Sequence, residues 1–329
     1  MIGKKYDVVS VGNAIVDVLG HVDESFLTVH GVTKGVMQLV DITRARKLYN
    51  LMSGAVERSG GSAANTAAGL ALLGSRTAYI GKVKDDFLGR IFTGDLHGLG
   101  VDFTTTKLVG SAAEETGRSM ILITPDGERS MNTYLGASEF LSPEDIDEES
   151  VTATNWLFLE GYRFDGPDSQ AAYRYASRVC RRAGGRVAIS LSDPFCIERH
   201  REAFQDLIRN NADMVIGNQE EFMALYEVTS LPAVVSRAVC EAILIVCTCS
   251  GDGVLVIENN ASIKVDAIPT DIVDATGAGD QFAAGFLHGH CAGLGHADSA
   301  QIGCRMAAAT ISHIGPRPYR EDVLTISVK

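Results

Sequence analysis

The chain has no long apolar run and no excess of positive charge, and each absence excludes a class of protein. No charge-free apolar stretch reaches the length of about 20 residues that a membrane-spanning helix needs. The apolar run after Lys4 and Lys5 is interrupted by Asp7 and Asp17, so no signal peptide is evident. A net charge of −12 argues against nucleic acid or an acidic membrane surface as a partner. We therefore expect a cytoplasmic protein that binds neither.

Paired cysteines and several familiar catalytic signatures are also missing. The seven cysteines include no C-x-x-C pair, and Cys247 and Cys249 stand two apart in an apolar run, which favours reduced thiols in the core. The chain contains no G-x-x-x-x-G-K-[ST] loop, no H-R-D or D-F-G segment and no H-E-x-x-H segment. His288 and His290 lack acidic or cysteine partners at ligand spacing, so we predict a structural or solvent-facing role for both.

The sequence does contain predicted strands that alternate with predicted helices, as in an α/β fold. Short β-branched runs predict strands at 6–11, 77–80, 156–159, 187–190, 214–216 and 242–248. Longer amphipathic stretches predict helices at 63–73, 168–182, 198–209, 219–226, 279–290 and 298–312. This order indicates a mostly parallel central sheet with helices on both faces.

Two segments break the alternation. Residues 18–40 alternate loosely, and residues 115–134 are typical of a hairpin whose turn is the PDGE sequence at 125–128. We predict that both contribute strands to a small second sheet, a lid over the carboxyl ends of the main strands, where open α/β sheets bind ligands. An ordinary β-excursion is the alternative. Residues 1–329 are interpreted as a single domain that carries this lid.

The most informative segment is DATGAGD at 274–280. Its two glycines leave backbone amides bare where a helix begins, and a helix N-terminus favours a phosphate. Asp280 follows at once, and it can take a proton from a hydroxyl whose oxygen attacks a phosphoryl group held by the amides. A cap that only matches the helix dipole is the alternative. Phe282 stands where a dinucleotide fingerprint needs its third glycine, which excludes that motif.

Three further segments are glycine-rich or cap a helix. GGSAANTAAG at 60–69 enters a helix with Asn65 in its first turn, either to admit a ligand or to pack helices closely. Asn218 and Glu221 have capping-box spacing, and the carboxylate could also organise magnesium through water. CSGDG at 249–253 ends a strand at the sheet's carboxyl edge, where it is either a turn or a nucleotide contact.

Together these motifs resemble the signatures of the ribokinase-like (PfkB) carbohydrate and nucleoside kinases, in order and over nearly the whole chain. The resemblance implies transfer of the γ-phosphoryl of ATP to a primary hydroxyl, with Asp280 as base. It implies an anion hole formed by the amides of Gly277, Ala278 and Gly279. It implies Mg²⁺ positioned by Asn218 and Glu221, and a monovalent cation, K⁺, held by backbone groups near Asp274. The implied nucleotide contacts are Asn218, Ser250, Gly251, Gly253, Thr276 and Gly279.

The N-terminal half is most similar to adenosine kinases. In that comparison Asp17 accepts hydrogen bonds from two ribose hydroxyls, and Arg129 approaches the transferring phosphate. The implied sugar contacts also include Asn13, Gly61, Ser62 and Asn65. The implied purine pocket is formed by Leu39, Met131, Leu135 and Tyr162. Met37 stands where a glutamine is common, with Gln38 next to it, and the pair Ala275-Thr276 also departs from the adenosine kinase pattern.

Three functions remain open from the sequence. The first is a nucleoside kinase with adenosine as its preferred substrate, which the apolar lid residues favour. The second is a sugar kinase of the same fold, acting on ribose, fructose or a keto-sugar acid, whose pocket should carry more hydrogen-bonding side chains. The third is a nucleoside-binding protein without activity, which the presence of Asp280 disfavours. A monomer and a homodimer are equally compatible with the resemblance.

Overall fold

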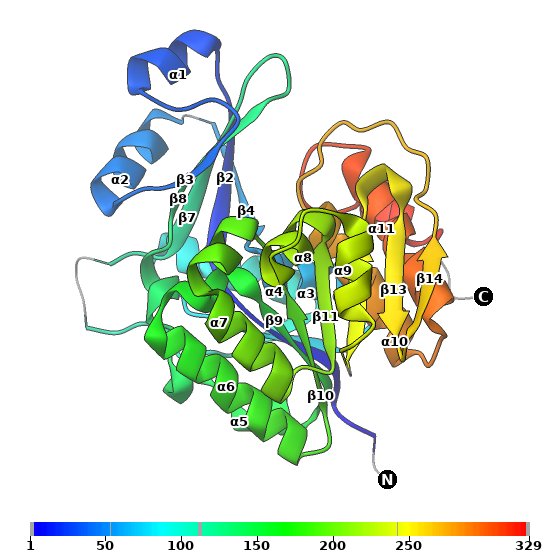
Figure 1. The fold of residues 1–329 in the computed structure, drawn as a ribbon. Helices are drawn as coiled ribbons and strands as arrows, with labels where there is room; N and C mark the ends of the chain where they lie inside the picture. Colours follow the sequence, from blue (N-terminus) through cyan, green and yellow to red (C-terminus); the bar gives the residue numbers. More distant parts are fainter. Residues whose placement is uncertain (1–2, 53, 111–113, 242, 327–329) are drawn as a thin grey trace.

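Two β-sheets organise the chain in a computed structural model that describes residues 3–52, 54–110, 114–241 and 243–326 (Figure 1). The large sheet has nine strands in the order β14-β13-β12-β11-β10-β9-β1-β5-β6. Its strands are β1 (Tyr6–Val11), β5 (Thr77–Ile80), β6 (Val101–Phe103), β9 (Thr154–Glu160), β10 (Arg186–Ser190), β11 (Met214–Asn218), β12 (Leu244–Thr248), β13 (Val254–Glu258) and β14 (Ala261–Val265).

The large sheet is parallel from β6 to β12, and β13 and β14 add an antiparallel edge. Central strands are apolar on both faces, as in β1, where Val8 and Val9 are fully buried against opposite layers. The predicted parallel sheet is therefore confirmed. The last predicted strand begins at Leu244, and its predicted first residue, Ala242, lies outside the described residues.

Helices cover both faces of this sheet. One layer is formed by α3 (Ser62–Leu72), α4 (Phe87–Leu99), α10 (Ala278–Cys291) and α11 (His296–Ile311). The opposite layer is formed by α5 (Glu148–Thr152), α6 (Pro167–Arg182), α7 (Pro194–Asn211), α8 (Gln219–Tyr226) and α9 (Leu231–Ala238). The short helix α12 (Arg320–Val323) packs against α11. No helix of the described residues is long and apolar enough to cross a membrane.

The second sheet has five strands in the order β3-β8-β7-β2-β4 and projects from the large sheet (Figure 1). Its strands are β2 (Ile15–His21), β3 (Met37–Leu39), β4 (Val56–Gly60), β7 (Gly117–Ile123) and β8 (Arg129–Tyr134). The predicted small sheet and its 115–134 hairpin are confirmed. Residues 18–40 contribute the end of β2 and the strand β3 to this sheet, as expected. A helix that was not expected lies between them, because Asp23 caps it and Gly31 ends it in the left-handed conformation.

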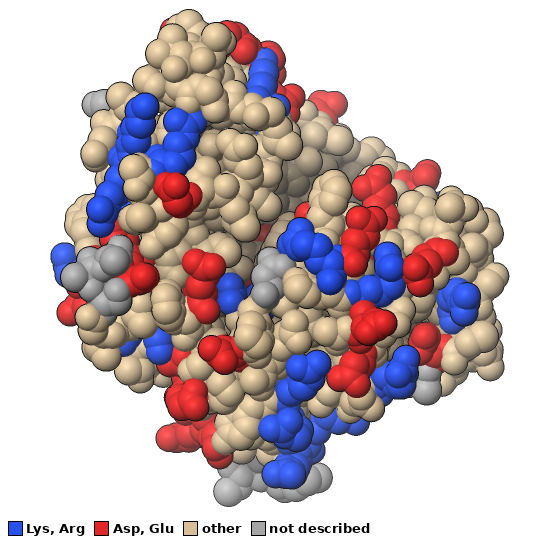
Figure 2. All heavy atoms as spheres, turned by 60° about the vertical axis from the view of Figure 1, so that its left-hand side comes forward, with Lys and Arg blue, Asp and Glu red and all other residues tan. Residues whose placement is uncertain are grey.

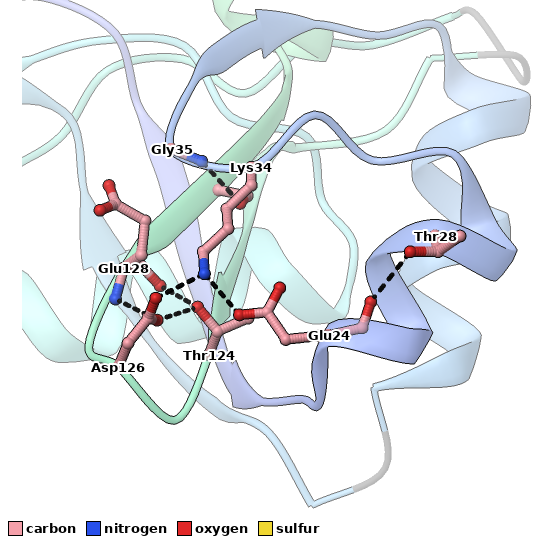
Figure 3. Close-up of polar contacts among 8 residues, drawn as sticks. Glu24, Thr28, Lys34, Gly35, Thr124, Asp126 and Glu128 are labelled. Atoms are coloured by element: carbon pink, nitrogen blue, oxygen red, sulfur yellow. Dashed lines mark hydrogen bonds and ion pairs between the residues drawn. The ribbon is translucent and has the colours of Figure 1, made fainter.

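That helix, α1 (Glu24–His30), and α2 (Ile42–Leu51) lie on the outer side of the small sheet (Figure 1). A basic side chain joins α1 to the tip of the β7–β8 hairpin (Figure 3). The Lys34 ammonium pairs with Glu24 of α1 and, at 2.5 Å, with Asp126 of the turn. The amide of Gly35 also donates to Ser130 Oγ of β8. These contacts attach the α1–β3 connection to the hairpin.

Alternation along the strands gives the small sheet two different faces. The outer face carries Val16, Val18, Met120 and Leu122, which are buried against the helical layer. Register places Asp17, Ser119 and Thr133 on the other face, and Met131 with Met37 at its far edge. Figure 2 shows the surface hollowed beside this sheet, with acidic and basic side chains interspersed over the visible face.

Candidate active site

The N-terminus of α10 presents bare amides. Its cap residue Gly277 has φ 77° and ψ 0°, and a Cβ there would lie 2.3 Å from the Pro316 carbonyl oxygen, so only glycine fits. Within the described residues, the amides of Gly277, Gly279 and Asp280 have no hydrogen-bond acceptor, and that of Ala278 makes a long 3.3 Å contact. A Cβ at Gly279 would enter open space. The predicted anion-hole residues therefore form an accessible group of donors.

Asp280 joins this helix end to the first turn of α3. The Ser62 hydroxyl donates to Oδ1 at 2.6 Å, and Asn65 Nδ2 donates to Oδ2 at 2.9 Å. Burial raises the pKa of Asp280 to about 6, against the lowering effect of these hydrogen bonds and of the Arg317 charge. A carboxylate with that pKa is ionised at neutral pH and basic enough to accept a hydroxyl proton.

Asp17 projects from β2 toward the same centre. Gly60 makes room for it, because a Cβ at that position would lie 2.3–2.4 Å from the Asp17 carboxyl atoms. The Asp17 carboxylate has no hydrogen-bond partner among the described residues. Burial raises its pKa to about 7, Arg317 and Arg129 oppose the rise, and the charge of Asp280 adds to it. Asp17 is thus an unpaired acceptor facing the predicted base.

Glu160 holds the segment after β1 and the start of α3 together, and the sequence motifs did not reveal it. Its carboxylate accepts the amides of Asn13 and Ala63, each at 2.7 Å. Gly61 then approaches so closely that a Cβ there would lie 2.1 Å from the Asn13 carbonyl oxygen. Burial raises the pKa of Glu160 to about 7. The sequence signal that could have revealed Glu160 is its position as an acidic residue directly after the apolar run 156–159.

Asn218 and Glu221 form the capping box expected at the start of α8. Asn218 Oδ1 accepts the Glu221 amide at 2.8 Å, and the Glu221 carboxylate accepts the Asn218 amide at 2.9 Å and its side-chain Nδ2 at 2.8 Å. Burial raises the pKa of Glu221 to about 7, and the charges of Asp193 and Asp280 add to the rise. The carboxylate therefore lies within the electrostatic reach of Asp280.

The predicted metal residues do not form a cage for direct ligation. Within the described ranges, no three His, Cys, Asp or Glu side chains are grouped so as to hold a metal ion. Each Glu221 oxygen keeps a lone pair free of the capping box, which fits contact with a hydrated Mg²⁺ through water. The Asp274 carboxylate accepts the amides of Thr276 and Gly315, so a monovalent cation there would have to use backbone carbonyls.

Arg129, at the start of β8, reaches the 274–280 segment. Its Nη2 lies 2.6 Å from Asp274 Oδ2, and its Nη1 lies 3.4 Å from Thr276 Oγ1. Both charged side chains are at least nine-tenths buried. The structure therefore places the predicted phosphate contact beside the anion hole, paired with a carboxylate.

The predicted nucleotide turn lies at the carboxyl end of β12. Ser250 begins a short 3₁₀ turn with φ 49°, and Gly253 follows with φ 89°, where a Cβ would lie 2.1 Å from the Val265 carbonyl oxygen. Gly251 faces open space. Thr248 pairs in register with Asn218, so the turn and the capping box stand next to each other at the sheet edge.

The predicted purine contacts come from two parts of the fold. Leu39 and Leu135 line one groove at the end of β3 and β8, with Phe140 also exposed there. Met131 lies on the same sheet, paired with Met37. Tyr162 lies instead in the 3₁₀ turn Gly161–Asp165 that follows β9, where the charges of Asp193, Asp280 and Glu221 act on its hydroxyl. Leu39 lies two residues from Met37 on β3 and therefore shares a sheet face with Met37 and Met131.

Comparison with known proteins identifies the family to which the chain belongs. The profile of the pfkB family carbohydrate kinases matches residues 7–322. The chain belongs to the pfkB carbohydrate kinase family.

Three relatives of the chain carry different substrate names. A solved structure named adenosine kinase, from Sinorhizobium meliloti, is 44% identical, with a TM-score of 0.89 over 98% of both chains. A probable sugar kinase from Rhizobium etli is 40% identical, with the same TM-score and coverage. A 5-dehydro-2-deoxygluconokinase of Geobacillus thermodenitrificans is 29% identical over 77% of this chain and 78% of its own length.

The family and the ribokinase-like fold are thus those expected from the sequence. The chain is thus a kinase of the pfkB carbohydrate kinase type. The relatives divide between a nucleoside and sugars as substrates.

Proposed function

We propose that the chain transfers the γ-phosphoryl group of ATP to the 5′-hydroxyl of a nucleoside, with adenosine as the preferred substrate and AMP as the product. The observation that carries this proposal is the unpaired Asp17 carboxylate on a lid face that continues into apolar Met131 and Met37. One carboxylate can accept hydrogen bonds from two ribose hydroxyls, and the apolar side chains can cover a base. The similarity to the Sinorhizobium meliloti adenosine kinase supports the same substrate.

The chain's own groups then have defined roles in the reaction. Asp17 orients the ribose so that the 5′-oxygen lies near Asp280, which accepts the hydroxyl proton as that oxygen attacks the phosphorus. Ser62 and Asn65 hold the Asp280 carboxylate in place through the hydrogen bonds described above. The amides of Gly277, Gly279 and Asp280 donate hydrogen bonds to the phosphoryl oxygens and so stabilise the negative charge that develops on them.

The 250–253 turn and Asn218 are proposed to contact the nucleotide, and Glu221 to hold hydrated Mg²⁺ through water. Magnesium bound there would supply positive charge to the phosphates. Closure of the lid over the substrate would exclude water and protect ATP from hydrolysis.

A sugar kinase is the second candidate, and a specific finding favours it. Curated relatives, including the Geobacillus thermodenitrificans protein, are named for a keto-sugar acid substrate. In that case Asp17 would bind two hydroxyls of the sugar itself, and the groove at Leu39 and Leu135 would lie outside the substrate site.

Calorimetric titration with adenosine, inosine, ribose, fructose and 5-dehydro-2-deoxygluconate tests these alternatives. Each ligand is then incubated with ATP and Mg²⁺, and ADP release is measured. We expect micromolar adenosine binding and turnover, with ribose and fructose silent. Turnover of a sugar with adenosine inert would refute the nucleoside assignment and leave the Asp280 chemistry standing.

A further inference from the structure

Arg317 is a buried cation that no sequence motif marked. It follows α11 in the loop Gly315-Pro316-Arg317, and its side chain is 13% exposed. Pro316 of the same loop packs against Gly277, the cap of the catalytic helix. Arg317 therefore enters the site from the end of the chain, behind the residues assigned to catalysis.

The guanidinium contacts three elements at once. Its Nη2 donates to the Ser59 carbonyl oxygen of β4 at 2.6 Å, and its Nη1 donates to Asp95 Oδ2 of α4 at 3.2 Å. Its Nε donates to Asn65 Oδ1 of α3 at 3.0 Å. Asp95 completes the arrangement by accepting the Ser59 amide at 2.9 Å. The lid strand β4 and helix α3 are thereby joined through one side chain.

This contact determines which way the Asn65 amide faces. An arginine can only donate, so the atom of Asn65 that meets it must be the oxygen. The Nδ2 group is then directed at Asp280 Oδ2, 2.9 Å away. The reversed amide would set its oxygen against the carboxylate and its donors against the guanidinium, and both contacts would be repulsive.

We infer that Arg317 is a positioning residue for the proposed reaction: through Asn65 it orients the base Asp280 and couples that base to the lid strand β4. The inference rests on the proposed function for its catalytic meaning, and on geometry alone for the link between Arg317 and Asp280. Arg317 touches no reacting atom in this arrangement, because Asn65 lies between it and Asp280.

Charge is the second route by which Arg317 acts on the base. Several elements contribute charged or titratable groups that interact electrostatically with Asp280. Among the described residues, Arg317 is the positively charged member of this set. The groups are Asp17 of β2, Glu160 at the end of β9, Tyr162 after it, Glu221 of α8 and Arg317. Removing the guanidinium therefore leaves Asp280 among acidic groups, which favours its protonated form.

The test measures Asp280 directly, without substrate. Protein labelled with ¹³C at the aspartate carboxyls is titrated by NMR, and the Asp280→Asn spectrum identifies the Asp280 signal. Arg317→Gln should raise the Asp280 midpoint by about one to two pH units, the range typical of losing a nearby opposite charge. Arg305→Gln, at an exposed position on α11, is the matched control and should leave the midpoint unchanged. An unmoved midpoint in Arg317→Gln would overturn the inference.

Arg317→Lys keeps the positive charge but loses the planar guanidinium with its fixed set of donors. This variant replaces the glutamine variant in the test if the latter fails to fold. Its Asp280 midpoint should stay within a few tenths of a pH unit of the parent. On whichever acceptor the chain phosphorylates, its kcat should fall about tenfold or more because Asn65 is no longer held. A parental kcat in this variant would refute the positioning role. Since the NMR midpoint needs no acceptor, a wrong substrate assignment leaves that part of the test intact.

Discussion

Replacing Asp280 with asparagine should separate catalysis from binding and from stability. The side chain keeps its shape, and the Ser62 hydroxyl can turn to accept from the new amide while Asn65 continues to donate to the remaining oxygen. The hydrogen bonds are thus replaced rather than lost. The proton acceptor is gone, and a general base contributes about 10²–10⁴-fold to rate, or about 3–5 kcal/mol of barrier.

The same substitution should make the ligand-free protein more stable at pH 8. The charge of Asp280 helps to raise the pKa of Asp17, Glu160 and Glu221, so its removal relieves repulsion among buried carboxylates. We expect kcat to fall at least a hundredfold, the substrate Kd to change less than threefold, and the thermal midpoint to rise. Turnover by coupled ADP release, calorimetry and thermal denaturation measure the three quantities.

A control distinguishes the base from a simple helix cap. Asp298 occupies the first turn of α11 and is exposed, so Asp298→Asn removes only a favourable interaction with a helix dipole. That variant should lose a little stability and keep its kcat. If Asp280→Asn behaves like Asp298→Asn, with lower stability and full turnover, the base assignment is wrong. Equal loss of kcat and substrate affinity would instead assign Asp280 to binding.

Four further predictions follow from the same geometry. Asp17→Asn should raise the substrate Kd about 30- to 700-fold, from about 2–4 kcal/mol of lost charge-assisted bonding, and an unchanged calorimetric Kd would exclude the ribose contact. Glu221→Gln should raise the Mg²⁺ concentration needed for half-maximal turnover and leave substrate binding intact; an unaltered Mg²⁺ titration contradicts this. Gly277→Ala should lower the thermal midpoint by several degrees because its Cβ would lie 2.3 Å from a carbonyl oxygen, whereas Gly279→Ala, facing open space, should not. Stability without ligand should fall as pH rises from about 5 to 8. The folded pKa values of Asp17, Glu160 and Glu221 are about 7, above the ordinary values of 3.8 for Asp and 4.5 for Glu, so the folded state holds more protons in that window. Each carboxyl contributes up to about 1.4 kcal/mol per pH unit, and urea denaturation that showed greater stability at pH 8 would refute the sign.

Much of the large sheet could be predicted because its signals are local. The apolar run 6–11 reappears as β1, buried on both faces, and helix α8 begins at the Asn218 cap that its spacing indicates. Helix α1 was missed although Asp23 and Gly31 are ordinary cap residues, because the loose alternation of 18–40 was interpreted by its period alone. Strand β4 was missed because its sequence VERSG is polar and becomes ordered only by pairing with β2.

The residues of the candidate site likewise include some that the sequence predicts and some that it does not. Asp280, Ser62 and Asn65 belong to dense motifs, and the structure joins their side chains by hydrogen bonds. Arg317 could not be predicted, since it acts across more than 200 residues of sequence and lies in no patterned segment. Glu160 was marked only by its place directly after the apolar run 156–159, and its partners Asn13 and Ala63 lie far away in the sequence. How the predicted purine contacts lie relative to one another could not be predicted either: Leu39 and Leu135 come from the region of β3 and β8, whereas Tyr162 follows β9, and no local pattern relates these segments.

The position of Arg129 connects the substrate end of the site to the phosphoryl end. A buried arginine that loses its carboxylate partner costs about 3–5 kcal/mol, so Arg129 should not leave Asp274 to meet a phosphate. The ion pair can stay intact when a phosphate binds, because a guanidinium carries five N–H donors. The contacts of Nη2 with Asp274 and of Nη1 with Thr276 leave the Nε donor and the second N–H of Nη1 for an anion. Strand β8 of the small sheet therefore stays attached to the 274–280 segment through this ion pair. Motion of the lid that brings a hydroxyl toward Asp280 should accordingly move Arg129 and the anion-hole segment as one unit, so that substrate binding and phosphoryl positioning are coupled.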